Sequence, residues 1–405
     1  MKQSYSQVRC FLLSLFVLLS LSLAGCWSSN EIEEVSLGVG LAFDKGMESK
    51  VERELREKGG GYPKKDLITT TFQIINPQAS GAGTRGGGAA QQKPYLNVSE
   101  TGDSVHQIVR EFSLRTDRPF VSQHLKVIVF GEDLVRRISL EPLTDQMLRD
   151  NQIRPSSLIL ISKGRASETL ETKKGGEVPA FRLHGIVDNQ YRSTRIMPPM
   201  SLAKLEGKIQ SGSSFMLQNV IAANREIKFA GAAVIKGRTN KLIGFLNETE
   251  LEGIMWITGK GSKGGVVKSF DKQTEQLIVY EIKSMKSKIT PRVNGSNISF
   301  DVNIESEGRL SEDWVESGDP FDNEFLKRAE KAAEEEVNRL VHHVTKKMQN
   351  EYITDVAGFG NQLRIEHPKL WEKVKADWDQ IFSKVPIKYN VKLTITDYGT
   401  LGSKK

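Results

Sequence analysis

The sequence predicts an α/β protein of two or three domains, and three observations lead to this class. The chain has 405 residues, whereas one domain ordinarily holds about 100–200. Apolar residues alternate with polar ones in some segments, as in half-buried strands, and recur every three or four residues in others, as in amphipathic helices. The two kinds of segment alternate along the chain, which is the order expected of mixed sheets with helices packed on them.

The composition excludes several classes of protein. Hydrophobic residues make up 38% and charged residues 26%, which are ordinary globular values and not those of a disordered or collagen-like chain. Beyond the N-terminus no apolar run reaches the length of about 18 residues typical of a membrane span, so a polytopic membrane protein is excluded. Two cysteines cannot build a disulfide framework or a four-thiolate zinc site. The formal charge of +7 suits work near an anionic surface but is far from that of a nucleic-acid binder.

The N-terminus has the features of an export signal. Lys2 and Arg9 precede a short apolar run at residues 11–23, and this run ends in small residues. The sequence Leu-Ala-Gly-Cys at residues 23–26 resembles the lipobox of bacterial lipoproteins. A signal peptidase needs small side chains before the cleavage point, and only a thiol forms the thioether to lipid. A plain signal peptide with a chance cysteine is the alternative.

The lipoprotein interpretation makes Cys26 the site of lipid attachment. Its thiol would carry a diacylglyceryl group, residues 1–25 would be removed, and the new amine would be acylated. Two or three acyl chains hold a protein stably on a membrane, whereas one chain is marginal. Removal of Lys2 and Arg9 lowers the net charge to near +5 (7 − 2), and removal of Cys10 leaves Cys26 as the one cysteine.

The first region of the mature chain alternates strands and helices. Residues 45–65, which contain three consecutive glycines, are expected to be an exposed loop or insertion, and residues 76–93 a glycine-rich loop. Strands are expected at residues 35–43, 67–75, 125–130 and 158–162, and helices at residues 99–114 and 133–149.

A domain junction is expected at residues 185–199, because the Pro198-Pro199 pair forces an extended backbone there. Residues 325–350 show the clearest helical pattern beyond it, with apolar residues stepping by three or four. The other expected elements are two strands within 229–245, a helix at 248–257, a flexible loop at 259–265, strands at 277–282, 298–304 and 387–395, and a helix opened by Pro368.

No pattern of residues predicts catalysis or metal binding. The glycine-rich segments do not have phosphate-loop spacing, the six histidines form no zinc motif, and no nucleophile elbow is present. His342 and His343 are adjacent, so on a helix they point about 100° apart and cannot easily share a metal ion. We therefore expect no catalytic residue, no metal and no cofactor, and a tethered binding or assembly protein is favoured over an enzyme.

Three features invite a functional interpretation beside a structural one. Arg192 and Arg195 could hold an anion or a partner carboxylate, but solvated arginines in a polar linker are favoured. Trp371 and Trp378 lie seven residues apart on one helical face and are expected to pack in a core or an interface rather than stack on a ligand. Two glycines around a phenylalanine at residues 355–360 predict a tight turn between helices.

Several segments, in their order and spacing, resemble the Ger(x)C family, the lipoprotein C subunits of nutrient germinant receptors in endospore-forming bacteria. The resemblance covers nearly all of the mature chain, and the glycine-rich expansion at residues 81–88 is a departure from it. The segments that carry it are Gly25-Cys26-Trp27, residues 31–32 and 37–43, Ser122-Gln123-His124-Leu125-Lys126, Gly231-Ala232-Ala233-Val234, Leu242-Ile243-Gly244-Phe245-Leu246, Asp355-Val356-Ala357-Gly358-Phe359-Gly360, His367-Pro368, Trp371 and Trp378.

The resemblance implies three domains, each a mixed sheet with flanking helices in an uncommon fold. We place them at residues 26–195, 196–265 and 266–400, after a signal peptide at residues 1–25. It implies anchoring through Cys26 to the outer face of the spore inner membrane, and a complex with a polytopic A subunit and a transporter-like B subunit. This complex senses nutrients and triggers ion and dipicolinate release. In this family nutrient recognition is attributed mainly to the B subunit. The resemblance assigns no catalytic residue and no ligand to the C subunit.

Two other classes are kept as alternatives. A solute-binding lipoprotein of a transporter would have two similar lobes and a deep cleft between them. An exported enzyme acting on the spore cortex would show paired acidic residues or a metal site, and the sequence singles out neither. A non-enzymatic receptor subunit would instead show an exposed apolar or charged patch beside its tether.

Overall fold

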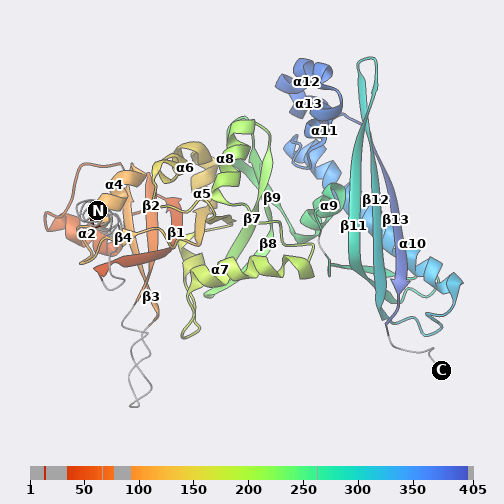
Figure 1. Ribbon diagram of the computed structural model, residues 1–405, viewed down its shortest axis with the longest axis horizontal. Helices are drawn as coiled ribbons and strands as arrows, with labels where there is room; N and C mark the ends of the chain where they lie inside the picture. The colour runs from red at the N-terminus through yellow and green to blue at the C-terminus, as the bar shows by residue number, and fades with distance from the viewer. Residues whose placement is uncertain (1–12, 15–33, 66, 77–92, 262, 400–405) are drawn as a thin grey trace, which may run out of the picture.

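The computed structural model describes residues 13–14, 34–65, 67–76, 93–261 and 263–399. The lipid attachment expected at Cys26, the signal peptide apart from residues 13–14, and the glycine-rich expansion at 81–88 lie outside these residues. Across the described ranges, no helix combines the length and the apolar character needed to cross a membrane. Figure 1 shows an elongated molecule with one sheet in its red-to-green part and a second sheet in its blue part.

The first sheet has nine strands in the order β3-β2-β1-β5-β6-β7-β8-β9, and β4 pairs with β1 outside this path. Four neighbours, β1, β5, β6 and β7, run parallel, and antiparallel strands flank them on both sides. The strands are β1 (Ser36–Lys45), β2 (Ile68–Ile75), β3 (Tyr95–Gly102), β4 (Phe120–Val121), β5 (Val127–Gly131), β6 (Leu158–Ser162), β7 (Phe215–Ala223), β8 (Glu226–Lys236) and β9 (Lys241–Leu246).

Helices cover both faces of this sheet, which explains why its parallel strands are continuous apolar runs. Every residue of β5 and β6 is buried, as expected of strands enclosed on both sides. One face packs against α4 (Val105–Phe112), α5 (Glu132–Arg137), α6 (Leu140–Arg149) and α8 (Leu202–Ser211). The other face packs against α7 (Pro179–Val187) and a short 3₁₀ helix at Ser167–Leu170.

The second sheet has four strands in the order β10-β11-β12-β13. Its centre is a long antiparallel hairpin whose tip projects from the molecule in Figure 1. The strict alternation of β12, with Phe300, Val302 and Ile304 buried, turns one face towards the helix α10 (Asn323–Lys346). The strands are β10 (Val266–Phe270), β11 (Leu277–Asn294), β12 (Asn297–Asp313) and β13 (Ile387–Asp397).

Helix α9 (Glu248–Thr258) joins the two sheets through a shared core. Eight consecutive residues of α9 are buried, and five of them belong to one apolar cluster with Val234 of β8 and Val344 of α10: Leu251, Ile254, Met255, Trp256 and Ile257. Gly253 allows the backbones to approach, because a Cβ there would lie 2.7 Å from the carbonyl oxygen of Leu340. The apolar side chains of α9 are thus buried between the sheets, and its two buried carboxylates are paired, Glu250 with Lys347 at 2.8 Å and Glu252 with Arg195 at 3.3 Å.

The edge of β13 is covered by acidic side chains of α10. The backbone N–H of Leu393 donates to Glu334 Oε1 at 3.1 Å, and that of Ile395 donates to Glu330 Oε1 at 2.8 Å. A free strand edge invites pairing with another chain, so these two carboxylates block part of that edge.

The mixed α/β class is confirmed, and so are most of the predicted elements. Four elements differ. The first residues of the helix expected at 99–114 belong to β3, and the helix opened by Pro368 ends at Val374, before a 3₁₀ turn at Lys375–Asp377. Residues 45–65 contain α2 (Lys50–Glu57), which is stabilised by a capping box between Ser49 and Glu52. The single helix expected at residues 133–149 is two helices, because the chain is extended at Ile138 and α6 begins anew at Leu140.

The number of sheets also differs from the expectation of one sheet in each of three domains. The first sheet crosses the expected boundary at residues 195–196 without a break, because β6 and β7 pair in parallel. This joint is narrow and consists of the pairs Ile161↔Asn219 and Ser162↔Val220. The division into domains at 26–195, 196–265 and 266–400 therefore stays a prediction.

Candidate functional site: a cleft between the two sheets

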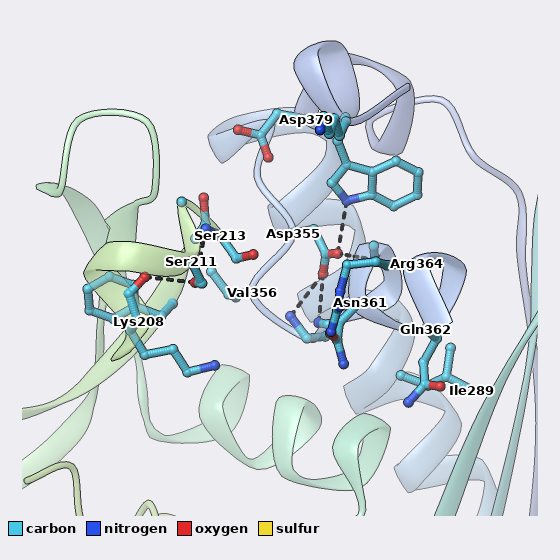
Figure 2. Close-up of a pocket in the computed structure, with 18 of the residues that line it drawn as sticks. Lys208, Ser211, Ser213, Ile289, Asp355, Val356, Asn361, Gln362, Arg364 and Asp379 are labelled. Carbon is cyan, nitrogen blue, oxygen red and sulfur yellow. Dashed lines mark hydrogen bonds between the residues drawn. The ribbon is translucent and has the colours of Figure 1, made fainter. Parts of the chain in front are cut away.

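A cleft of about 1100 Å³ lies where the first sheet meets the second (Figure 2). Its lining comes from six separate parts of the chain: residues 197–200, the end of α8 with the loop to β7, the β8–β9 turn, the end of α9, the middle of β11, and residues 355–380. Sites between packed units are frequent locations for ligands. This cleft is therefore the candidate functional site.

The first wall of the cleft is the tight end of α8. Gly212 adopts a left-handed backbone conformation with φ of 63°, which ends the helix and turns the chain towards β7. Ser211 Oγ donates to the carbonyl oxygen of Lys208 at 2.8 Å and accepts from the Ser213 N–H at 3.3 Å. The Lys208 side chain extends from this wall into the cleft (Figure 2).

The opposite wall is organised around the buried carboxylate of Asp355. Oδ1 accepts from the N–H groups of Ala357 and Gly358 at 3.1 and 2.9 Å. Oδ2 accepts from the Gly360 N–H at 2.7 Å and from Trp378 Nε1 at 3.0 Å. Burial raises the pKa of the Asp355 carboxyl, and the hydrogen bonds from Gly360 and Trp378 oppose this rise. All four donors are directed at one side chain, which fixes this wall.

The tight turn predicted at residues 355–360 is confirmed, and it leads into three short helices. Gly358 has φ of 90° and is the N-cap of the first of them. The helices are α11 (Phe359–Glu366), α12 (Pro368–Val374) and α13 (Trp378–Phe382), and they lie together near the long hairpin in Figure 1.

Trp378 packs in the core and Trp371 is partly buried against it, as predicted, but they do not share one helical face, because a 3₁₀ turn at Lys375–Asp377 separates α12 from α13. Their rings make an edge contact with centroids 5.5 Å apart, and Trp378 is buried. Trp378 also contacts Phe300 of β12 and Phe382 of α13. Trp371 lines the cleft with one part of its surface, whereas the indole N–H of Trp378 is used inside the fold.

Polar contacts across the base of the cleft tie the two walls together. Lys236 Nζ of β8 lies 3.2 Å from Asp379 Oδ2 and donates to the carbonyl oxygen of Ile353 at 3.1 Å. Nearby, the Tyr352 hydroxyl donates to the carbonyl oxygen of Phe245 at 2.8 Å. The cleft is thus built between two firmly connected units.

Three lysines of the cleft have no acidic partner among the described residues. Lys208, Lys260 and Lys288 all line it, and no ion pair within 4.0 Å joins any of them to a described carboxylate. Partial burial lowers the pKa of the Lys260 ammonium, and the positive charge of Lys208 lowers it further. The lining of the cleft therefore carries positive charge that no described carboxylate neutralises in an ion pair.

Arg192 and Arg195 lie outside the cleft lining, and neither is a free anion site. Arg195 forms ion pairs with Glu248 at 3.4 Å and with Glu252 at 3.3 Å, both on α9. Burial raises the pKa of the Glu252 carboxyl, and the nearby Arg195 opposes this rise. Arg192 Nε donates to the hydroxyl of its neighbour Tyr191 at 2.9 Å. The solvated linker favoured for this pair is wrong for Arg195, which ties the junction to α9.

The adjacent histidines separate as expected. His342 Nδ1 lies 2.7 Å from the carbonyl oxygen of Asn338, whereas His343 Nε2 faces Glu250 Oε1 at 3.4 Å. In the described parts of the chain, no group of three His, Cys, Asp or Glu side chains is arranged to hold a metal ion.

Sequence reasoning did not find the lysines of the cleft. Lys208, Lys260 and Lys288 come from three distant segments, and none belongs to a motif. Among the described residues, one sequence feature predicted a part of the cleft. The glycines at residues 358 and 360 predicted the turn on the wall opposite Lys208.

Comparison with known proteins covers the chain almost end to end. Residues 28–221 match the family described as "Spore germination protein N-terminal domain". Residues 230–399 match "Spore germination B3/ GerAC like, C-terminal". The two matches are separated at the turn between β7 and β8, inside the first sheet.

Relatives from Bacillus subtilis (strain 168) agree with these matches. Spore germination protein YndF is 52% identical over 387 residues, which is 95% of each chain. Spore germination protein B3 is 30% identical over 393 residues, covering 96% of this chain and 98% of the relative. The crystal structure of the GerBC protein superposes with a TM-score of 0.60 at 28% identity, covering 83% of this chain and 97% of that one. This chain therefore belongs to the Ger(x)C family of spore germination proteins.

Proposed function

We propose that this chain is the lipid-anchored, non-enzymatic C subunit of a nutrient germinant receptor. The observation that carries the proposal is the match over 95% of both chains to a spore germination protein. Because the match includes both family regions, no large part of the chain is left to supply a different activity. The subunit would be required for nutrient-triggered germination.

Cys26 is the proposed point of attachment to the outer face of the spore inner membrane. Its support is the lipobox at residues 23–26, preceded by a basic segment and a short apolar run. Attachment through two or three acyl chains would hold the subunit at the membrane surface. There it would meet its partners at a high effective concentration, so modest interfaces would suffice for assembly.

The proposed partners are a polytopic A subunit and a transporter-like B subunit. Within such a complex the C subunit would contribute folded surface rather than a reaction. The charged face of the second sheet, where Lys392 of β13 lies opposite Glu305 of β12 and Lys388 lies opposite Asp301, offers polar surface of the kind found at the rims of transient interfaces.

The first test is nutrient-triggered dipicolinate release from spores that lack this gene. Calcium-dipicolinate germination of the same spores is the control, because it reports whether the later steps of germination still work. We expect loss of the response to one set of nutrients with normal germination in the control. An unchanged response to every nutrient would count against the proposal and favour the solute-binding lipoprotein.

The second test addresses the anchor. Cys26→Ala should release the chain from the membrane fraction and reduce nutrient-triggered germination, while circular dichroism of the purified protein stays unchanged. Normal germination by spores in which the variant is found off the membrane would contradict the proposed role of the anchor.

A further inference from the structure

We infer that the cleft between the two sheets binds a small organic anion, whose acidic group lies against the wall formed by Lys208 and Lys260. This goes beyond the proposed function, because membership of a receptor complex does not require a ligand on this chain. The steps of the inference are the charge of that wall, the chemistry of the rest of the lining, and the size of the space.

Some lysines of the cleft walls are paired with a carboxylate, and others are not. Lys236 is paired with Asp379, and Lys375 is paired with Glu372, so these lining cations are neutralised by the chain itself. Lys208 comes from α8, Lys260 follows α9, and Lys288 lies on β11, and among the described residues no carboxylate pairs with any of the three. Positive charge from three separate elements therefore lines one space without a paired carboxylate among the described residues.

Lys208 and Lys260 repel each other. The positive charge of Lys208 contributes to the lowered pKa of Lys260, and no carboxylate contributes in the opposite direction. Bringing like charges together costs free energy, and an anion placed beside both ammonium groups would remove this cost. Such an anion would also form charge-assisted hydrogen bonds, which are about twice as strong as neutral ones.

The carboxylates that line the cleft do not neutralise the positive charge of Lys208 and Lys260. Asp355 is held by four N–H donors of its own wall. Glu366 and Asp377 lie on the opposite side, in the segment of α11 to α13. A ligand that lies against Lys208 and Lys260 would therefore be nearer to these ammonium groups than to the carboxylates of the lining.

The remaining lining favours an organic anion over a simple inorganic ion. Ser213 and Ser214 place hydroxyl groups beside Lys208 at the end of α8. Apolar side chains also line the space, and they are Met197, Met216, Ile257, Ile289 and Val356. Ligand pockets typically combine mostly apolar walls with a few polar groups that fix orientation. The volume of about 1100 Å³ is at the upper end of the usual range for small-molecule sites.

The test uses the full chain purified in mild detergent, with isothermal titration calorimetry at an ionic strength of about 0.15 M so that loosely attracted ions are screened. The probes are citrate, succinate and phenyl phosphate, with succinamide as the neutral counterpart of succinate. We expect saturable binding of at least one of the three anions, at one site per chain, and none of succinamide.

The decisive comparison is between two double variants with the same change in charge. Lys208→Gln with Lys260→Gln should weaken anion binding by about tenfold or more, the effect of losing one charge-assisted hydrogen bond. Lys204→Gln with Lys263→Gln removes two lysines that do not line the cleft and should leave the affinity unchanged. Circular dichroism checks that both variants are folded.

Three results would overturn the inference. The first is the absence of saturable binding for all three anions up to millimolar concentrations. The second is equal weakening in the two double variants, which would mean that net charge rather than the cleft attracts the anion. The third is retained affinity in the cleft variant. None of these results depends on germination. The anion site can therefore be disproved while the receptor role stands, and the receptor role can be disproved while the anion site stands.

Discussion

Trp378 donates a hydrogen bond from its indole Nε1 to Oδ2 of Asp355 at 3.0 Å, across 23 residues of chain. The same carboxylate holds three backbone N–H groups at the start of α11. One acidic side chain therefore determines both the turn at residues 355–360 and the position of α13, and through them the wall of the cleft opposite Lys208.

Asp355→Asn should destabilise the chain by about 2–3 kcal/mol, the cost of leaving a buried donor unsatisfied. The amide keeps one acceptor oxygen, but its NH₂ group would face N–H groups that have no other acceptor in this turn. Urea unfolding followed by tryptophan fluorescence measures the change in free energy. Asp377→Asn is the control because that side chain is exposed, and an equal loss in both variants would contradict the role given to Asp355.

Gly231→Ala should be much more damaging than Gly295→Ala. Both glycines have positive φ, 78° and 62°, so each substitution incurs the left-handed penalty of about 1–2 kcal/mol. A Cβ at Gly231 would also overlap the carbonyl oxygen of Leu246 on β9, whereas a Cβ at Gly295 would meet nothing within 4 Å. Thermal unfolding should show the larger fall in Tm for Gly231→Ala, and similar values would exclude the proposed backbone clash.

Lys64→Met should destabilise the chain by about 3–5 kcal/mol, the usual effect of removing one partner from a buried ionic cluster. The Lys64 ammonium lies within 4.0 Å of Glu48, Glu52 and Glu100, and its side chain is 8% exposed. Without it, three carboxylates would repel one another with little solvent. The loss should shrink in acid, where carboxylates are protonated.

Lys50→Met provides the matched control for this cluster. Its ammonium pairs with Glu54 at 3.7 Å, but the side chain is 86% exposed, so removal should change stability by less than about 1 kcal/mol. Urea unfolding at neutral and acidic pH measures both variants. A loss for Lys64→Met that does not depend on pH would count against repulsion among the carboxylates.

Stability should fall as pH rises from about 10 through about 12, partly because of Tyr280. Burial raises the pKa of its hydroxyl to about 12, above the ordinary value of 10.0. The folded chain then keeps a proton in a pH range in which the unfolded chain releases it, so rising pH favours unfolding. Tyr280→Phe should make the alkaline loss of stability less steep, measured by urea unfolding at several pH values. An unchanged slope would show that Tyr280 ionises normally.

Strict local patterns allowed much of the fold to be predicted. Phe300, Val302 and Ile304 alternate with polar residues, and β12 is present with these side chains buried. The three-to-four spacing at residues 325–350 predicted α10, whose buried residues form the core of the second sheet. In both segments one face packs on the core and the other is exposed to solvent, so the spacing of the apolar residues identifies the buried face.

Other features depend on contacts between distant residues and leave no local pattern. The polar composition of α2 suggested a loop, yet Glu52 is buried because Ser49, Lys64 and Thr101 lie around it. The continuity of the first sheet rests on the pairing of β6 with β7, which joins residues 58 positions apart (219 − 161 = 58). The cleft was missed for the same reason, since its lysines meet only after both sheets are assembled.

The position of β1 sets a geometric limit on the whole molecule under the proposed attachment. β1 begins at Ser36, ten residues beyond Cys26 (36 − 26 = 10). A fully extended chain spans about 3.5 Å per residue, so β1 would stay within about 35 Å of the membrane surface. Because β1 pairs with β2 on one side and β5 on the other, this limit applies to the sheet as a rigid body. Orientation above the bilayer, rather than distance from it, would then be the main freedom left to the subunit.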